Sequence, residues 1–183
     1  MDNTIRQYKN AIEKCTNVFK SKMKDYGIAW RILRTSSLTD QIYIKANRIR
    51  SIEEKGKHEI NEGVWDEFVG IINYSIMALI QLELGPADKS DDDRERALGL
   101  YNKYAQMSME LMEKKNHDYD EAWRNMRISS LTDIILMKLM RIKQIEDNHG
   151  KTEVSEGLDA NYFDIVNYAV FALIKLDETE KSK

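Results

Sequence analysis

The feature that most constrains this chain is an internal duplication. The first half contains DYGIAWRILRTSSLTD, and the second half contains DYDEAWRNMRISSLTD. Residues 25–54 and 118–147 agree at more than half of their positions, and EGVWDEFVGIINYSIMALIQLE (62–83) aligns with EGLDANYFDIVNYAVFALIKLD (156–177). Two copies are too few for a solenoid, so we expect them to pack against each other as a pseudo-twofold pair.

The spacing of apolar residues predicts an all-α fold. Apolar positions recur every three or four residues, and strand-type alternation is absent. Each copy should form three helices, near 3–23, 37–54 and 60–84 in the first copy and near 95–116, 130–147 and 155–177 in the second. The segment LGPADKSDDD combines glycine, proline and acidic residues, which predicts a linker. We therefore expect one compact bundle made of a first repeat at 1–84, a linker at 85–93 and a second repeat at 94–183.

Composition limits the classes of function. The chain has 183 residues, is 42% hydrophobic and carries a net charge of −3, which is ordinary for a soluble globular protein and argues against nucleic-acid binding. Cys15 is the only cysteine, so no intrachain disulfide can form, and this fits a reducing cytoplasm. The start of the chain lacks a signal-type apolar run, and no stretch approaches the roughly 20 apolar residues of a membrane span.

Acidic residues on the third helix of each copy are candidate metal ligands. A helical stripe joins Glu62, Asp66 and Asn73 in the first copy, and it continues into apolar residues. The corresponding stripe of the second copy is formed by Glu156, Asp164 and Asn167. We expect both stripes to face the interior, where neighbouring carboxylates require a cation or a basic side chain.

The second helix of each copy offers such basic side chains. Lys45 and Arg48, like Lys138 and Arg141, fall on the same side as buried-type isoleucines. One interpretation is a structural network of ion pairs with the third-helix acids. The other is a polar pocket in which acids hold Mg²⁺ and bases hold phosphate. A solvated face is the remaining alternative.

The two copies differ at the acidic positions. Ala160 stands where the first copy has Asp66, and Gly70 stands where the second copy has Asp164. This mismatch suggests two half-sites that diverged after duplication, and we predict a composite or asymmetric site. Sequence drift within a structural network would give the same pattern.

The repeated phrase places aromatic and basic residues before a helix N-terminus. In a ligand site, the aromatics would stack on a base and the arginines would reach phosphate. Alternatively, the aromatics close the end of the core. The residues concerned are Tyr26, Trp30 and Arg34 in the first copy and Tyr119, Trp123 and Arg127 in the second. Before the phrase the match fades, although Tyr8 and Lys22 still correspond to Tyr101 and Lys115.

The second helix of the second repeat is apolar on additional faces. The first copy has more polar residues at most of the equivalent positions. We therefore expect this helix to pack on the other repeat or on another subunit, which allows a homo-oligomer. The residues concerned are Leu136, Met137, Leu139 and Met140.

The pattern DYG-x-AWR, SSLTD and K-x-x-R, followed by EG and IINY, resembles the nucleotide modification associated domain of bacteria and phages over most of both halves. More distantly, the helical unit is similar to the MazG-like all-α pyrophosphohydrolases, which use clustered carboxylates and Mg²⁺ to hydrolyse nucleoside triphosphates. That resemblance implies metal ligands at Glu62, Asp66, Glu156 and Asp164 and phosphate contacts at Lys45, Arg48, Lys138 and Arg141. The MazG-like acids of the second helix are here replaced by Lys-x-x-Arg.

The sequence therefore supports two alternative hypotheses about function. The first is a Mg²⁺-dependent nucleotide pyrophosphohydrolase, or another protein of nucleotide metabolism. The second is a non-catalytic helical module that binds a nucleotide or a protein partner. In either case the nucleotide would contact the second-helix bases, the aromatic phrase and the third-helix asparagines Asn73 and Asn167.

Overall fold

The computed structural model describes residues 2–56, 63–89 and 92–181, and all regular structure within these ranges is helical. The predicted linker lies between the third and fourth long helices. Both the all-α fold and the three helices per copy are confirmed. The elements are α1 (Asp2–Tyr26), η1 (Ala29–Ile32), α2 (Thr35–Lys55), α3 (Val64–Leu84), α4 (Arg94–Tyr119), η2 (Ala122–Asn125), α5 (Ile128–Asp147) and α6 (Leu158–Lys181).

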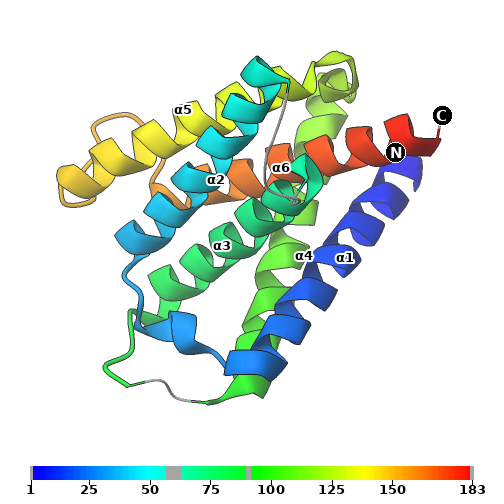
Figure 1. Ribbon diagram of the computed structural model, residues 1–183. Coiled ribbons are helices and arrows are strands. Elements are labelled where there is room, and N and C mark those ends of the chain that lie inside the picture. The colour runs from blue at the N-terminus through cyan, green and yellow to red at the C-terminus, as the bar shows by residue number, and fades with distance from the viewer. Residues whose placement is uncertain (1, 57–62, 90–91, 182–183) are drawn as a thin grey trace.

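The helices form three layers around a pseudo-twofold axis. Helices α3 and α6 lie in the centre, α2 and α5 pack on one side of them, and α1 and α4 pack on the other (Figure 1). Each helix of the first repeat contacts its own counterpart in the second repeat. The duplication therefore produces one shared hydrophobic core.

Helix α3 is the most apolar element of the first repeat. By length and composition alone, α3 could cross a membrane. The expectation that no stretch of the chain approaches a membrane span is therefore wrong for this helix. Most of its length is buried against neighbouring helices, as in the core helix of a globular protein. Helix α1 is amphipathic instead and buries Tyr8, Ala11, Cys15 and Phe19, which recur every three or four residues.

Symmetric hydrogen bonds join the two repeats. The Tyr8 hydroxyl donates to the side-chain oxygen of Asn167 at 2.7 Å, and the equivalent Tyr101 donates to Asn73 at 2.7 Å. On the other side of the central layer, the Thr39 hydroxyl donates to Glu146 at 2.9 Å. The Thr132 hydroxyl donates to Glu53, also at 2.9 Å. Each of these four bonds crosses from one repeat to the other and helps to hold the two repeats together.

The second helix of each repeat begins earlier than the sequence pattern predicts. Arg34 and Arg127 occupy the N-cap positions in an extended conformation, and Ser37 lies within the first turn. The 3-10 turns η1 and η2 precede these helices, and the chain is extended between each turn and the helix that follows. The predicted helix starts near 37 and 130 are therefore two residues late.

The additional apolar faces of α5 divide into two groups. Leu136 and Leu139 are buried within the chain, where α5 packs on α2 and α6. Met137 and Met140 remain 44% and 49% exposed. Packing on the other repeat is thus confirmed for part of this surface, and a homo-oligomer stays a prediction.

Candidate functional site

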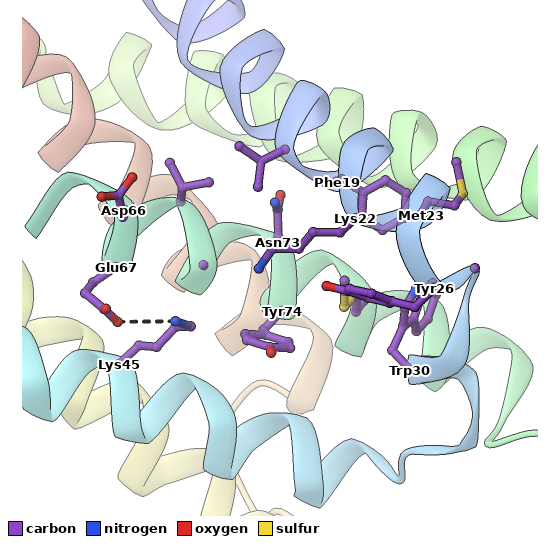
Figure 2. A pocket seen from close by; sticks show the side chains of 15 residues that line it. Phe19, Lys22, Met23, Tyr26, Trp30, Lys45, Asp66, Glu67, Asn73 and Tyr74 are labelled. Carbon is purple, nitrogen blue, oxygen red and sulfur yellow. Dashed lines mark hydrogen bonds and ion pairs between the residues drawn. The ribbon is translucent and has the colours of Figure 1, made fainter. Parts of the chain in front are cut away.

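A cavity of about 390 Å³ lies between α1, α2 and α3 of the first repeat. Figure 2 shows aromatic side chains at one end, the carboxylates and Lys45 at the other, and Lys22 and Asn73 between them. The aromatic and apolar lining includes Phe19, Met23, Tyr26, Trp30, Tyr74 and Met77, and the polar lining consists of Lys22, Lys45, Asp66, Glu67 and Asn73.

Glu67 is the buried carboxylate of this cavity, with only 2% of its surface exposed. It accepts a hydrogen bond from Lys45 Nζ at 3.3 Å and another from Arg48 Nη1 at 2.5 Å. The expected pairing of second-helix bases with a third-helix acid is confirmed, with a different acid from the one predicted. Two cations satisfy Glu67, as a buried carboxylate requires.

Asp66 lies at the exposed edge of the same cavity. Its carboxylate accepts the backbone N–H of Gly63 at 3.2 Å, which caps the start of α3. The expectation that Asp66 faces the interior is wrong: within the first turn of α3 the Asp66 side chain is exposed, and the neighbouring Glu67 is the buried acid. The predicted partner Glu62 lies outside the described residues.

Asn73 and Lys22 occupy the middle of the cavity. The Asn73 amide donates to the Cys15 carbonyl at 3.1 Å and its oxygen accepts from Tyr101, so its role in the structure is to hold α1 and α4. Lys22 extends from α1 toward Asn73 and Tyr74 (Figure 2). Lys22 forms no ion pair or hydrogen bond with any residue that the structure describes, and its ammonium is available to a ligand.

Gly70 shapes the wall between the two lysines. A Cβ atom at this position would lie 2.5 Å from Lys45 Cε and 3.0 Å from Lys45 Nζ. The Lys45 side chain therefore crosses the bare backbone of Gly70 on its way to Glu67. A glycine here keeps the cavity open and places an ammonium group beside it.

The second repeat places larger side chains at the same positions. Asp164 replaces Gly70, Phe163 replaces Val69, and Phe171 replaces Met77. The Phe171 ring stacks on Trp123 with centroids 4.2 Å apart and an interplanar angle of 4°.

Buried Asp164 accepts hydrogen bonds from Lys138 at 2.6 Å and from Lys115. These two lysines are the counterparts of Lys45 and Lys22. Both lysines of the second repeat are thus paired with one carboxylate, whereas in the first repeat Lys45 pairs with Glu67 and Lys22 pairs with no residue that the structure describes.

The other predicted site residues are dispersed. Arg34 and Arg127 are exposed at the N-caps and do not line the cavity. Glu156 and Arg141 line a separate hollow of about 840 Å³ beside the loop that precedes α6. Asn167 is buried and accepts the Tyr8 hydroxyl. Over the described ranges, no three His, Cys, Asp or Glu side chains lie close enough to hold a metal ion.

Several cavity residues were missed by sequence reasoning. Lys22 carried a usable signal, because it is identical to Lys115 in a region where the copies otherwise diverge. Glu67 was obscured by the neighbouring Asp66, which is one residue away and faces another direction. Tyr74 and Met77 belong to an apolar helix in which no single face is distinguished by its composition.

One family model matches the chain twice. The model is described as nucleotide modification associated domain 1, and it matches residues 22–82 and 115–176. The two matches together span more than half of the chain and coincide with the two structural repeats, so the chain belongs to this family. Comparison with curated proteins and with solved structures gave no significant match.

Proposed function

We propose that this member of the nucleotide modification associated domain 1 family binds a nucleotide in the cavity of its first repeat. The observation that carries the proposal is the lining of the cavity, where aromatic side chains adjoin Lys22, which pairs with no residue that the structure describes. A planar base would pack on Trp30, and its phosphate would be held by Lys22 and Lys45. The family's name associates it with nucleotide modification, which supports this class of ligand.

Burial and charge support the same assignment. The cavity is concave, mostly apolar and equipped with a small number of polar groups, which are the common properties of small-molecule sites. Arg48 supplies a second cation to Glu67. Lys45 can therefore be shared with a bound anion while Glu67 keeps a partner.

Calorimetric titration with a panel of nucleoside mono- and triphosphates tests this proposal. Trp30→Ala should abolish binding, because it removes the aromatic wall of the cavity. Trp123→Ala is the matched control from the second repeat, where Trp123 stacks on the Phe171 side chain. It should lower stability by about 3–5 kcal/mol and keep the affinity. Equal losses of affinity in folded samples of both variants would contradict the proposal.

Mg²⁺-dependent hydrolysis of nucleoside triphosphates is a second candidate, which follows from the resemblance to MazG-like enzymes. Asp66 favours it, because this carboxylate lines the cavity and accepts one backbone N–H among the described residues. Mg²⁺ is commonly held by one or two carboxylates together with substrate phosphates. In this candidate Asp66 would hold the ion in the first repeat. The second repeat would take no part, because Glu156 lines a separate hollow and Asp164 is bound by two lysines.

The chemistry of the metal would be the polarisation of phosphoryl oxygens and the activation of a water molecule. The lysines would hold the phosphates, and the aromatic end would fix the base. Release of pyrophosphate from triphosphates in the presence of Mg²⁺, lost in Asp66→Asn without loss of stability, would support hydrolysis. Binding without release from any canonical or modified triphosphate would leave the non-catalytic module.

A further inference from the structure

We infer that the first repeat binds one ligand that carries a flat ring and a single anionic group, as a nucleoside monophosphate does, while the second repeat holds internal side-chain substitutes for both groups. This inference rests on the proposed nucleotide site and specifies its ligand. It follows from comparing the two repeats position by position.

The substitute for the ring is Phe171. Its side chain lies flat on Trp123, with 4.2 Å between centroids and 4° between planes. The equivalent residue of the first repeat is Met77, which lines the cavity together with Trp30. The Phe19 ring also lies near Trp30, with centroids 6.3 Å apart, but it is tilted by 55° and does not stack flat on the indole. A planar ring of a ligand in the cavity would make the flat contact with Trp30 that Phe171 makes with Trp123.

The substitute for the anion is the Asp164 carboxylate. One oxygen accepts a hydrogen bond from Lys138 at 2.6 Å, and the other accepts one from Lys115. Their counterparts Lys45 and Lys22 line the cavity together with Gly70, which has no side chain. In the first repeat Lys45 pairs with Glu67, which Arg48 also contacts, and Lys22 has no carboxylate partner among the described residues, so an anion between the two ammonium groups would take the place that Asp164 has in the second repeat.

The acidic end of the cavity limits the charge of the ligand. Beyond Lys45 the lining consists of the Glu67 and Asp66 carboxylates (Figure 2). A phosphate between Lys22 and Lys45 finds two cations, whereas further phosphates would approach these carboxylates. In the absence of a divalent metal, the site should therefore prefer a monophosphate to a triphosphate.

Calorimetry in EDTA with deoxyuridine 5′-monophosphate and deoxyadenosine 5′-monophosphate tests the inference, with the free nucleosides and the triphosphates as comparisons. We expect one site per chain for at least one monophosphate, with affinity at least about tenfold above its nucleoside and its triphosphate. Lys22→Met should reduce monophosphate affinity to that of the nucleoside. Because Lys22 is exposed and unpaired among the described residues, this variant should keep its fold. Lys115→Met is the matched control and should bind normally.

A double variant gives the first repeat the two side chains that the second repeat has at the equivalent positions. Gly70→Asp combined with Met77→Phe supplies the carboxylate and the ring internally, so binding should fall at least about tenfold in a folded protein in which Lys45 has shifted to admit the new side chain. Retained binding in the folded double variant would overturn the inference, as would triphosphates that bind more tightly than monophosphates in EDTA. Either result would leave the proposed nucleotide site intact, whereas a wild-type chain that binds no nucleotide would overturn both.

Discussion

The Tyr101 hydroxyl of the second repeat donates a 2.7 Å hydrogen bond to the Asn73 side chain in the cavity of the first. Both residues are buried, and Asn73 uses its amide group to bind the Cys15 carbonyl. This contact holds the central layer against α1 and α4, and its symmetric counterpart joins Tyr8 to Asn167. The cavity is thus lined by residues of the first repeat, and a hydrogen bond from the second repeat stabilises it.

Removal of this hydroxyl should destabilise the whole bundle. Tyr101→Phe leaves the buried Asn73 oxygen without its donor, and we expect a loss of about 1–3 kcal/mol in the free energy of unfolding. Urea denaturation followed by circular dichroism measures this loss. Tyr119→Phe is the matched control, since Tyr119 is 71% exposed and should change stability by less than about 0.5 kcal/mol.

The two neighbouring carboxylates of the cavity should behave differently on substitution. Glu67→Gln leaves Lys45 and Arg48 without their shared counter-charge, so stability should fall by about 1–3 kcal/mol. Asp66→Asn weakens an exposed helix cap and should cost less than about 1 kcal/mol. Denaturant unfolding of both variants checks this order, and a Glu67→Gln protein more stable than wild type would show that the pairing is unimportant.

The symmetric glutamates at the repeat interface should make stability depend on pH. Burial raises the pKa of Glu53 and of Glu146 above the ordinary value of 4.5. Because the folded pKa is raised, the stability that these groups contribute is complete below the unfolded pKa and is lost as pH rises through the folded pKa.

A double variant isolates this effect from the other titrating groups. Glu53→Gln with Glu146→Gln keeps the side-chain oxygens that accept from Thr132 and Thr39. The free energy of unfolding of wild type minus that of the variant should therefore decrease from about pH 4 to about pH 7. A difference that stays constant or increases over this range would contradict the assigned pKa direction.

Cys15 should be inert in the folded protein. Its side chain is fully buried, and burial raises the pKa of its thiol to about 12. A thiol reagent such as Ellman's reagent should react at least about two orders of magnitude more slowly in native buffer than in denaturant. Rapid native labelling would show that α1 opens readily from the bundle.

The fold was largely predictable from the duplication, because helical periodicity and a repeated sequence leave few ways to bury the apolar faces. Helix boundaries were less predictable. Helix α3 starts at Val64, about four residues later than predicted, and within its first turn Asp66 is exposed while Glu67 faces α2. Adjacent residues differ by about 100° around a helix, so the sequence pattern alone did not show which of the two acids is buried.

The cavity itself could not be predicted from the sequence, because it depends on side chains that are absent or small at particular positions. Gly70 and Met77 line the cavity of the first repeat. Their importance is seen only by comparison with Asp164 and Phe171, which occupy the equivalent positions in the second repeat. The mismatch at Gly70 was evident in the alignment of the halves. Its structural consequence became clear only from the structure, in which the Lys45 side chain lies across Gly70.

The most direct measurement of the central claim is a crystal structure of the protein soaked with 5-bromo-2′-deoxyuridine 5′-monophosphate, with the bromine located by anomalous scattering. The account predicts one bromine per chain in the first repeat, with the base on Trp30 and the phosphate between Lys22 and Lys45. A bromine beside Trp123, or in the hollow lined by Arg141 and Glu156, would contradict it.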